Sequence, residues 1–222
     1  MMELRIKGLE TRFPFSSGKI FGLCVEEPEF YYRLVRAFFR LDEELIVVVG
    51  GDKICKTAKE VLYFDSFSDL SPNSKASLTT LYKKAGNLLL NGERQKRYEE
   101  IEAELSSFLS DISLDFSYPV IFDDQVELGK IMQSFNFRYD LEANTDFYSD
   151  FIAYVKAALD TANPHFLVAK DLFSYLPEEK IPELEAELES LGITMINIVG
   201  KAKGGQPKEI KTLVLDGALC EF

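Results

Sequence analysis

One string in the sequence has the residue types and spacing to bind a phosphate group. The apolar run Leu45–Val49 is followed by Gly50–Thr57, which nearly reproduces the phosphate-binding loop G-x-x-x-x-G-K-[ST]. Cys55 stands where the second glycine belongs, and a side chain there obstructs the close curl of backbone N–H groups around phosphate. Asp171, after another apolar run, could serve as the metal-binding aspartate of such enzymes. The string predicts a nucleotide hydrolase or kinase, or else a surface turn that matches by chance.

The same string contains basic residues that could contact DNA. Lys53, Lys56 and Lys59 lie within seven residues, and Lys201 and Lys203 belong to a second basic segment. The chain as a whole has 25 basic and 37 acidic residues, a net charge of -12, which by itself disfavours a nucleic-acid partner. Lysines gathered on one face can still bind phosphates. We therefore treat these five as candidate DNA-binding residues, with loop solvation as the alternative.

Acidic residues form a third candidate site. Calcium binds several carboxylate and carbonyl oxygens and tolerates irregular spacing. Pro119 predicts a bend that could bring together two acidic groups on either side of it. The pattern of an EF-hand loop is absent. The candidate ligands are Asp115, Asp123, Asp124 and Glu127, and a solvated acidic edge is the alternative.

The elements that must position these residues alternate between strands and helices. Apolar runs predict strands near residues 4–7, 20–25, 45–49, 61–64, 166–169, 195–199 and 210–215. Apolar residues at helical spacing predict helices over 28–41, 71–89, 93–111, 147–162 and 177–191, and a short one from Asp123. Gly92 between two helices predicts an antiparallel helical hairpin, and Phe38 and Phe39 are expected in the core.

This order of elements predicts an α/β fold. The strand–helix–strand pattern at 166–199 is typical of a parallel sheet. We expect an α/β head domain, a sheet flanked by helices, built from residues 1–68 and 144–222. A mostly helical insertion, residues 69–143, interrupts it.

Composition narrows the class of protein. Hydrophobic residues make up 46% of the chain, which excludes wholesale disorder. The three cysteines are widely spaced and contain no C-x-x-C pair, so neither a disulfide framework nor a zinc site is predicted. No apolar run approaches the ~20 residues of a membrane span, and the first residues show no signal-peptide core. These features predict a soluble cytoplasmic protein without a membrane partner, and His165, the single histidine, is expected to be structural.

Several features follow one another in a particular order along nearly the whole chain. Gly18–Phe21 leads into Pro28–Phe39, a basic stretch at 52–59 precedes 60–65, and Leu114-Asp115 is followed by Asp123-Asp124. The most specific feature is FLVAKDLFSYLPEE at 166–179, and the chain ends in Leu-Cys-Glu-Phe. In this order the sequence resembles the small CRISPR-associated adaptation protein of subtype II-A systems.

The resemblance implies a function without catalysis. Members of that family have an α/β head related to nucleotide-binding folds that has lost the nucleotide site, and a helical leg. They form homotetrameric rings, bind the ends of double-stranded DNA through a basic central hole, and are stabilised by calcium. They act in spacer acquisition alongside the CRISPR integrase proteins and the effector nuclease.

The resemblance also implies roles for particular residues. Lys53 falls at a basic position of the family's DNA-facing segment, with Lys56 and Lys59 near it. The calcium-coordinating region of the leg is matched by Asp115, Asp123, Asp124 and Glu127. This chain carries an insertion around 119–122 in that region. Three hypotheses remain: a calcium-dependent DNA-end binder, a nucleotide-dependent enzyme that uses residues 50–57, and an acidic scaffold that binds proteins.

Overall fold

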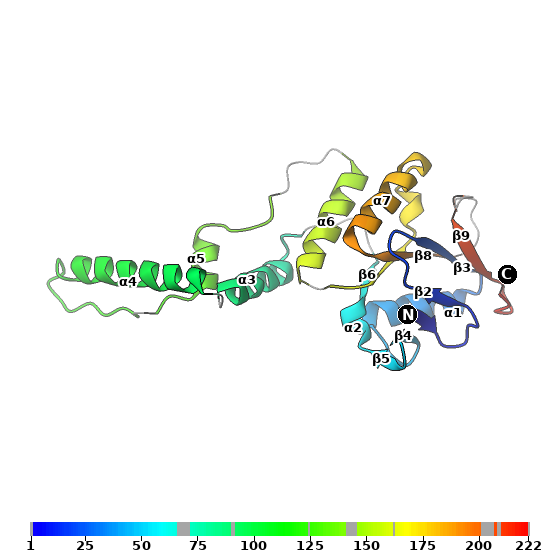
Figure 1. The fold of residues 1–222 in the computed structure, drawn as a ribbon, viewed down its shortest axis with the longest axis horizontal. Helices are drawn as coiled ribbons and strands as arrows, with labels where there is room; N and C mark the ends of the chain where they lie inside the picture. Colours follow the sequence, from blue (N-terminus) through cyan, green and yellow to red (C-terminus); the bar gives the residue numbers. More distant parts are fainter. Residues whose placement is uncertain are drawn as a thin grey trace. The chain divides into compact units, whose positions relative to one another are not determined.

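A parallel sheet is the centre of the α/β part of the molecule. The computed structural model describes residues 2–65, 72–89, 92–123, 125–140, 146–161, 163–200, 207 and 210–221. Within them the five parallel strands are, in spatial order, β6 (Val61–Phe64), β7 (Phe166–Lys170), β8 (Thr194–Gly200), β3 (Ile20–Val25) and β9 (Lys211–Leu215). Helices flank this sheet (Figure 1), so the predicted α/β fold class is confirmed.

A second, antiparallel sheet packs beside the first. Its strands, in spatial order, are β2 (Arg12–Pro14), β1 (Met2–Ile6), β4 (Ile46–Gly50) and β5 (Lys53–Cys55). Leu4 and Ile6 of β1 and Ile46 of β4 are fully buried, whereas the residues between them face outward. The period-two pattern of β1 therefore gives this sheet one apolar and one polar face.

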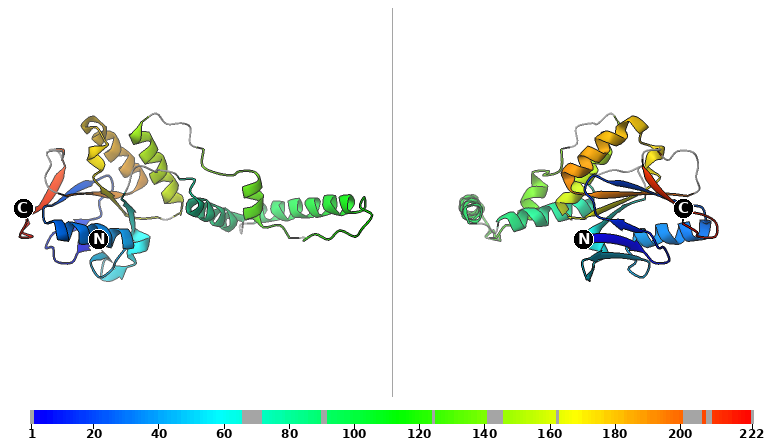
Figure 2. Two further views of the ribbon diagram at one scale, coloured as in Figure 1. Left: turned by 180° about the vertical axis from the view of Figure 1, so that it is seen from behind. Right: turned by 45° about the vertical axis from the view of Figure 1, so that its right-hand side comes forward.

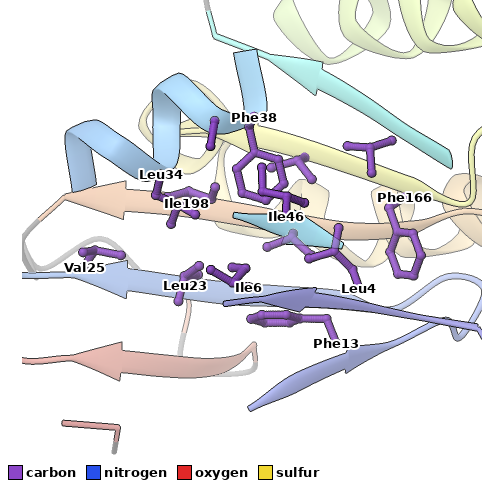
Figure 3. Close-up of a cluster of buried hydrophobic side chains, with 14 of the residues drawn as sticks. Leu4, Ile6, Phe13, Leu23, Val25, Leu34, Phe38, Ile46, Phe166 and Ile198 are labelled. Atoms are coloured by element: carbon purple, nitrogen blue, oxygen red, sulfur yellow. The ribbon is translucent and has the colours of Figure 1, made fainter. Parts of the chain in front are cut away.

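The parallel sheet is buried on both faces. Phe166 and Val168 of β7 belong to a core shared with the antiparallel sheet and α1 (Pro28–Arg40). Leu167 and Ala169 point the other way, into a core with α6 (Phe147–Thr161) and α7 (Ile181–Leu191). Figures 1 and 2 show the helices on the two sides of the sheet, and Figure 3 shows the first core. Burial on both faces explains why these strands are continuous apolar runs.

Helix α1 has clear local signals at both ends. Pro28 occupies its first turn, where a missing N–H costs nothing. Leu41 ends the helix in the left-handed conformation with φ of 53°. Phe30, Leu34, Ala37 and Phe38 are buried (Figure 3 labels Leu34 and Phe38). The expectation that Phe39 lies in the core is wrong, since its side chain is 69% exposed.

The chain divides into two units. The head unit is Met1–Leu70 with Glu142–Phe222, and the leg unit is Ser71–Leu141. Besides the elements above, the head unit contains α2 (Thr57–Glu60) and the 3-10 turns Leu172–Ser174 and Glu178–Lys180. In the described residues, no helix is long and apolar enough to cross a membrane.

The leg unit contains α3 (Lys75–Leu89), α4 (Glu93–Ser113) and α5 (Leu128–Ser134). The predicted antiparallel hairpin of α3 and α4 does not form: α4 extends away from the end of α3 (Figures 1 and 2), and no residue of α4 is buried. The segment before α5 packs on α4 instead, because Tyr98 donates a hydrogen bond to the carbonyl of Val126. The predicted short helix begins at Leu128 rather than at Asp123, which lies in the preceding non-helical segment.

Candidate nucleic-acid interface

The string Gly50–Thr57 forms a hairpin followed by a single helical turn. Gly50 pairs with Lys53 across the antiparallel strands β4 and β5. Gly51 occupies the turn with φ of +63°, a conformation that glycine adopts without strain. Helix α2 then begins at Thr57. A phosphate-binding loop instead connects a strand of the parallel sheet to a long helix, so this arrangement differs from it.

Thr57 is buried and donates hydrogen bonds to other groups of the protein. Its side chain is fully buried, and its hydroxyl donates to the carbonyl of Ile46 at 3.4 Å. Its backbone N–H donates to Oε1 of Glu43 at 3.1 Å. In a phosphate-binding loop this hydroxyl binds the magnesium ion. Here both donors hold α2 against β4 and its preceding loop.

The position where a phosphate-binding loop would lie is the junction of β3 and α1. Glu27 caps α1 there: its carboxylate accepts hydrogen bonds from the N–H of Glu29, at 3.0 Å, and of Phe30. A helix N-terminus attracts anions because its first N–H groups have no partner within the helix. In this chain the protein supplies that anion itself, and a phosphate in the same place would meet a carboxylate.

The carboxyl ends of β6 and β7 carry a cluster of tyrosines and carboxylates. Oδ1 of Asp65 accepts from Nζ of Lys170 at 3.3 Å and from the hydroxyl of Tyr63 at 3.4 Å. Burial, and then the charge of Asp171, raises the pKa of Tyr31 to about 12, and Asp171 also accepts a hydrogen bond from that tyrosine. Burial is likewise the main cause that raises the pKa of Tyr63. Asp171, the candidate metal ligand of the nucleotide hypothesis, thus has a protein partner.

Lys53, Lys56 and Lys59 are all exposed. Lys53 opens β5, Lys56 precedes α2, and Lys59 lies one helical turn after Lys56. The N–H of Lys59 donates to the carbonyl of Lys56, the N-cap of α2, at 2.9 Å, so the last two are neighbours along the backbone. None of the three has an ion-pair partner in the part of the chain that the structure describes.

Two of the carboxylates near these lysines, Glu60 and Glu43, have internal partners, whereas Asp52, next to Lys53, is exposed. Oε2 of Glu60 lies 2.6 Å from Nδ1 of His165, and the backbone carbonyl of Glu60 accepts from the N–H of His165 at 3.0 Å. The imidazole packs edge-on against Phe15, with ring centroids 4.9 Å apart. Glu43 accepts from Thr57. Because Glu43 and Glu60 are occupied, Asp52 is the nearby carboxylate that offsets part of the three lysine charges, and a net positive charge remains for an external anion.

A groove of about 840 Å³ lies on the outer face of the antiparallel sheet. Its basic lining residues are Arg5, Lys7 and Arg12. Both arginines pair with Glu3, which compensates part of their charge. These three residues are not among the candidates predicted from the sequence, although the alternation in Leu4-Arg5-Ile6-Lys7 is typical of a strand with a basic outer face.

The structure separates two of the candidate calcium ligands, Asp115 and Glu127. Asp115 follows the carboxyl end of α4, whereas the N–H of Val126, next to Glu127, donates to Oε1 of Glu102 near the middle of that helix. Since a helix advances about 1.5 Å per residue, Asp115 lies on the order of 20 Å along the axis from Glu102. The straight helix therefore separates Asp115 from Glu127. In the described ranges no group of three potential ligands is found.

Three further candidates lie outside the described residues. They are Lys201 and Lys203 of the second basic segment and Asp124 of the acidic group. The described candidates are therefore the three lysines at 53, 56 and 59 and three carboxylates, Asp115, Asp123 and Glu127, which form no three-ligand group.

Comparisons with known proteins leave the function open. No family model and no curated protein matches the sequence. The chain is similar to a solved structure described as a putative ABC transporter (ATP-binding protein) from Pyrococcus furiosus, with 11% identity, 96% of each chain covered and a TM-score of 0.34. A likeness at this level says nothing about what this chain binds.

Proposed function

We propose that this protein binds the ends of double-stranded DNA, without sequence preference and without catalysis, as a homotetrameric ring during CRISPR spacer acquisition. The family resemblance supplies the biological role and the proposed partners, the CRISPR integrase proteins and the effector nuclease. The proposed DNA-contacting residues are exposed lysines of the head unit.

The observation that carries the proposal is the group of exposed lysines at 53, 56 and 59. Their neighbours Glu43 and Glu60 bond to Thr57 and His165, so these carboxylates are not the partners of the lysines. Ammonium groups bind phosphates as point charges and read no sequence. Several copies around one duplex would add their modest contributions, which fits an otherwise acidic chain.

Self-association is supported by an apolar stripe on α4. Apolar residues recur there at helical spacing, and each is exposed: Ile101, Leu105, Phe108, Leu109 and Ile112. A helix whose apolar stripe is exposed in one chain is stabilised when another surface covers it. We assign that surface to a second copy of this chain.

In this proposal, calcium stabilises the assembly of several copies. Asp115, Asp123 and Glu127 do not form a metal-binding group within one chain, so these residues by themselves do not fit a calcium ion there. In the proposal, calcium is held between copies by carboxylates of more than one chain. A chelator should then dissociate the assembly and reduce DNA binding together.

The test is a gel-shift titration in calcium that compares a linear duplex with the same DNA closed covalently into a circle. Binding to linear DNA that survives competition by closed circles is expected, because a ring must thread over an end. Equal binding to both forms would contradict the ring, and binding to neither would contradict the DNA proposal. Repeating the titration with EDTA tests the calcium dependence.

A charge-matched pair of variants locates the contact. Changing Lys53, Lys56 and Lys59 to glutamate should reduce duplex affinity by at least about tenfold. Changing Arg94, Lys96 and Arg97, which are exposed on α4, to glutamate alters net charge by the same amount and should have a smaller effect. If the two variants lose affinity equally, only net charge matters. ATP turnover that disappears with Lys56→Ala would instead support the nucleotide hypothesis.

A further inference from the structure

The outer face of α1 carries three arginines that the proposed function does not use. Arg33, Arg36 and Arg40 are all exposed. Their spacing of three and four residues places them on one face of the helix. No carboxylate pairs with any of them among the described residues. Arg40 lies in the last turn, where its positive charge interacts favourably with the helix dipole. Arg33 and Arg36 lie too far from the end of the helix for this interaction.

The same three side chains line one groove. It has a volume of about 340 Å³ and is closed on its other side by the loop after α1, through Asp42, Glu44 and Leu45. Oδ1 of Asp42 accepts the N–H of Glu44 at 2.9 Å. The carboxylates of Asp42 and Glu44 offset two of the three arginine charges, so the groove keeps a net positive charge. Guanidinium groups around a groove bind phosphate oxygens in pairs, with more directional contacts than ammonium groups make.

Two aromatic residues lie on the same face. Tyr32 is 61% and Phe39 is 69% exposed. Arg36 is four residues from Tyr32 and three from Phe39, so both rings flank the central arginine. Exposed aromatic rings next to guanidinium groups are the combination that binds single-stranded nucleic acid, since each ring offers a surface on which an unpaired base can stack.

We propose that the outer face of α1 binds a single-stranded nucleic-acid segment, with Arg33, Arg36 and Arg40 on its phosphates and Tyr32 and Phe39 stacked on its bases. The aromatic residues decide between a single strand and a duplex. Bases in a duplex are already stacked on one another, so rings on a helix surface gain nothing from them. This site is distinct from the lysines at 53–59 and does not rest on the proposed function.

The test uses fluorescence anisotropy of a labelled single-stranded oligothymidine with the full-length protein. Changing Arg33, Arg36 and Arg40 to glutamine should weaken binding at least about tenfold and lower the salt-dependence slope by about two, because three phosphate contacts are lost. Changing Arg94 and Arg97 on α4 to glutamine is the control for exposed arginines, and it should leave the affinity unchanged. The variant with glutamates at Lys53, Lys56 and Lys59 should also keep its affinity for the single strand.

A second variant tests the stacking. Changing Tyr32 and Phe39 to alanine should weaken binding of the single strand by about tenfold or more and leave binding of a blunt-ended linear duplex unchanged. Equal losses for both ligands would overturn the proposal, because stacking on unpaired bases would then play no part. Retained affinity in the arginine variant would overturn it as well.

Two measurements on the wild-type protein do not depend on how the variants fold. Photocrosslinking with a bromodeoxyuridine oligonucleotide should attach the strand to a peptide that contains α1, and attachment only elsewhere would contradict the site. Polyglutamate should compete weakly with the strand. If polyglutamate binds this face and the oligonucleotide does not, the face recognises an acidic protein and the proposal is wrong.

Discussion

At the scale of single residues, this protein bonds carboxylates and hydroxyls to its own backbone and side chains at the places where a nucleotide enzyme would keep them free. Glu27 caps α1, Thr57 bonds to the carbonyl of Ile46, and Asp171 accepts from Tyr31. Each of these contacts removes a group that phosphate or magnesium would otherwise engage. The residue chemistry of the head unit therefore favours binding through exposed basic side chains.

Thr57→Val should separate the structural from the catalytic role of this residue. The change keeps the shape but removes the buried hydroxyl, so the free energy of unfolding should fall by about 1 kcal/mol. Urea denaturation measures this loss. Duplex DNA affinity should stay the same, because Lys56 and Lys59 keep their positions. A loss of nucleotide turnover without a loss of stability would contradict the structural role.

Tyr31 should make the protein less stable at alkaline pH. Its pKa is raised to about 12 in the folded protein, against about 10 in an unfolded chain. Between these values the folded state holds more protons, so stability is complete below pH 10 and falls as the pH rises toward 12. Tyr31→Phe should flatten this decline, whereas Tyr32→Phe, on the exposed face of the same helix, should not. Denaturant midpoints between pH 9 and 11.5 test the difference.

At the scale of elements, close backbone approach fixes how the loop before β3 meets α7. Gly18 has φ of +77°, and a Cβ there would lie 2.7 Å from Cβ of Glu189 and 3.1 Å from the carbonyl oxygen of Glu185. The N–H of Gly18 donates to the carbonyl of Ile193 at 2.9 Å. Only glycine meets both the conformational and the spatial requirement. This contact holds α7 against the amino end of the parallel sheet.

Gly18→Ala should cost about 3 kcal/mol of unfolding free energy, because left-handed strain and a backbone clash add. Gly192→Ala is the matched control. Gly192 also has a positive φ, of +70°, but a Cβ there would meet nothing within 4 Å, so the expected loss is only about 1 kcal/mol. Equal losses in the two variants would show that the clash with α7 is unimportant.

At the scale of the whole molecule, the two units differ in how they bury apolar side chains. In the described residues, every buried hydrophobic side chain belongs to the head unit. The leg unit has about as many residues as a small domain, yet its apolar side chains on α4 and in the segment that follows remain exposed. A unit of this size without a core needs another surface for its stability. Assembly of several copies would provide one.

Leu105→Glu with Phe108→Glu should convert an assembled protein into monomers, because two charges in the α4 stripe cannot be buried without partners. Light scattering after size-exclusion chromatography measures the molar mass. Ser107→Glu with Ser110→Glu adds the same charge to exposed positions on the opposite face of α4, and it should leave the mass unchanged. A wild-type protein that is monomeric at every concentration would contradict the assembly.

The sequence by itself determined most of the helices and strands. The spacing of apolar residues predicted a helix over 28–41, and α1 covers Pro28–Arg40. The prediction of 93–111 likewise corresponds to α4, Glu93–Ser113. These predictions succeed because periodicity and capping are local properties that a few neighbouring residues carry. The strand predicted near 166–169 likewise corresponds to β7, Phe166–Lys170.

Only the tertiary structure decided what the candidate residues contact. The residue types of Gly50–Thr57 nearly match those of a phosphate-binding loop. However, β4 pairs with β1, about forty residues earlier in the sequence, and the string therefore lies in the antiparallel sheet, where β4 and β5 form a hairpin. Glu60 meets His165 across 105 positions of sequence, and α4 separates Asp115 from Glu127. Such contacts depend on which distant segments pack together. The spacing of residues along the chain does not determine which distant segments pack together.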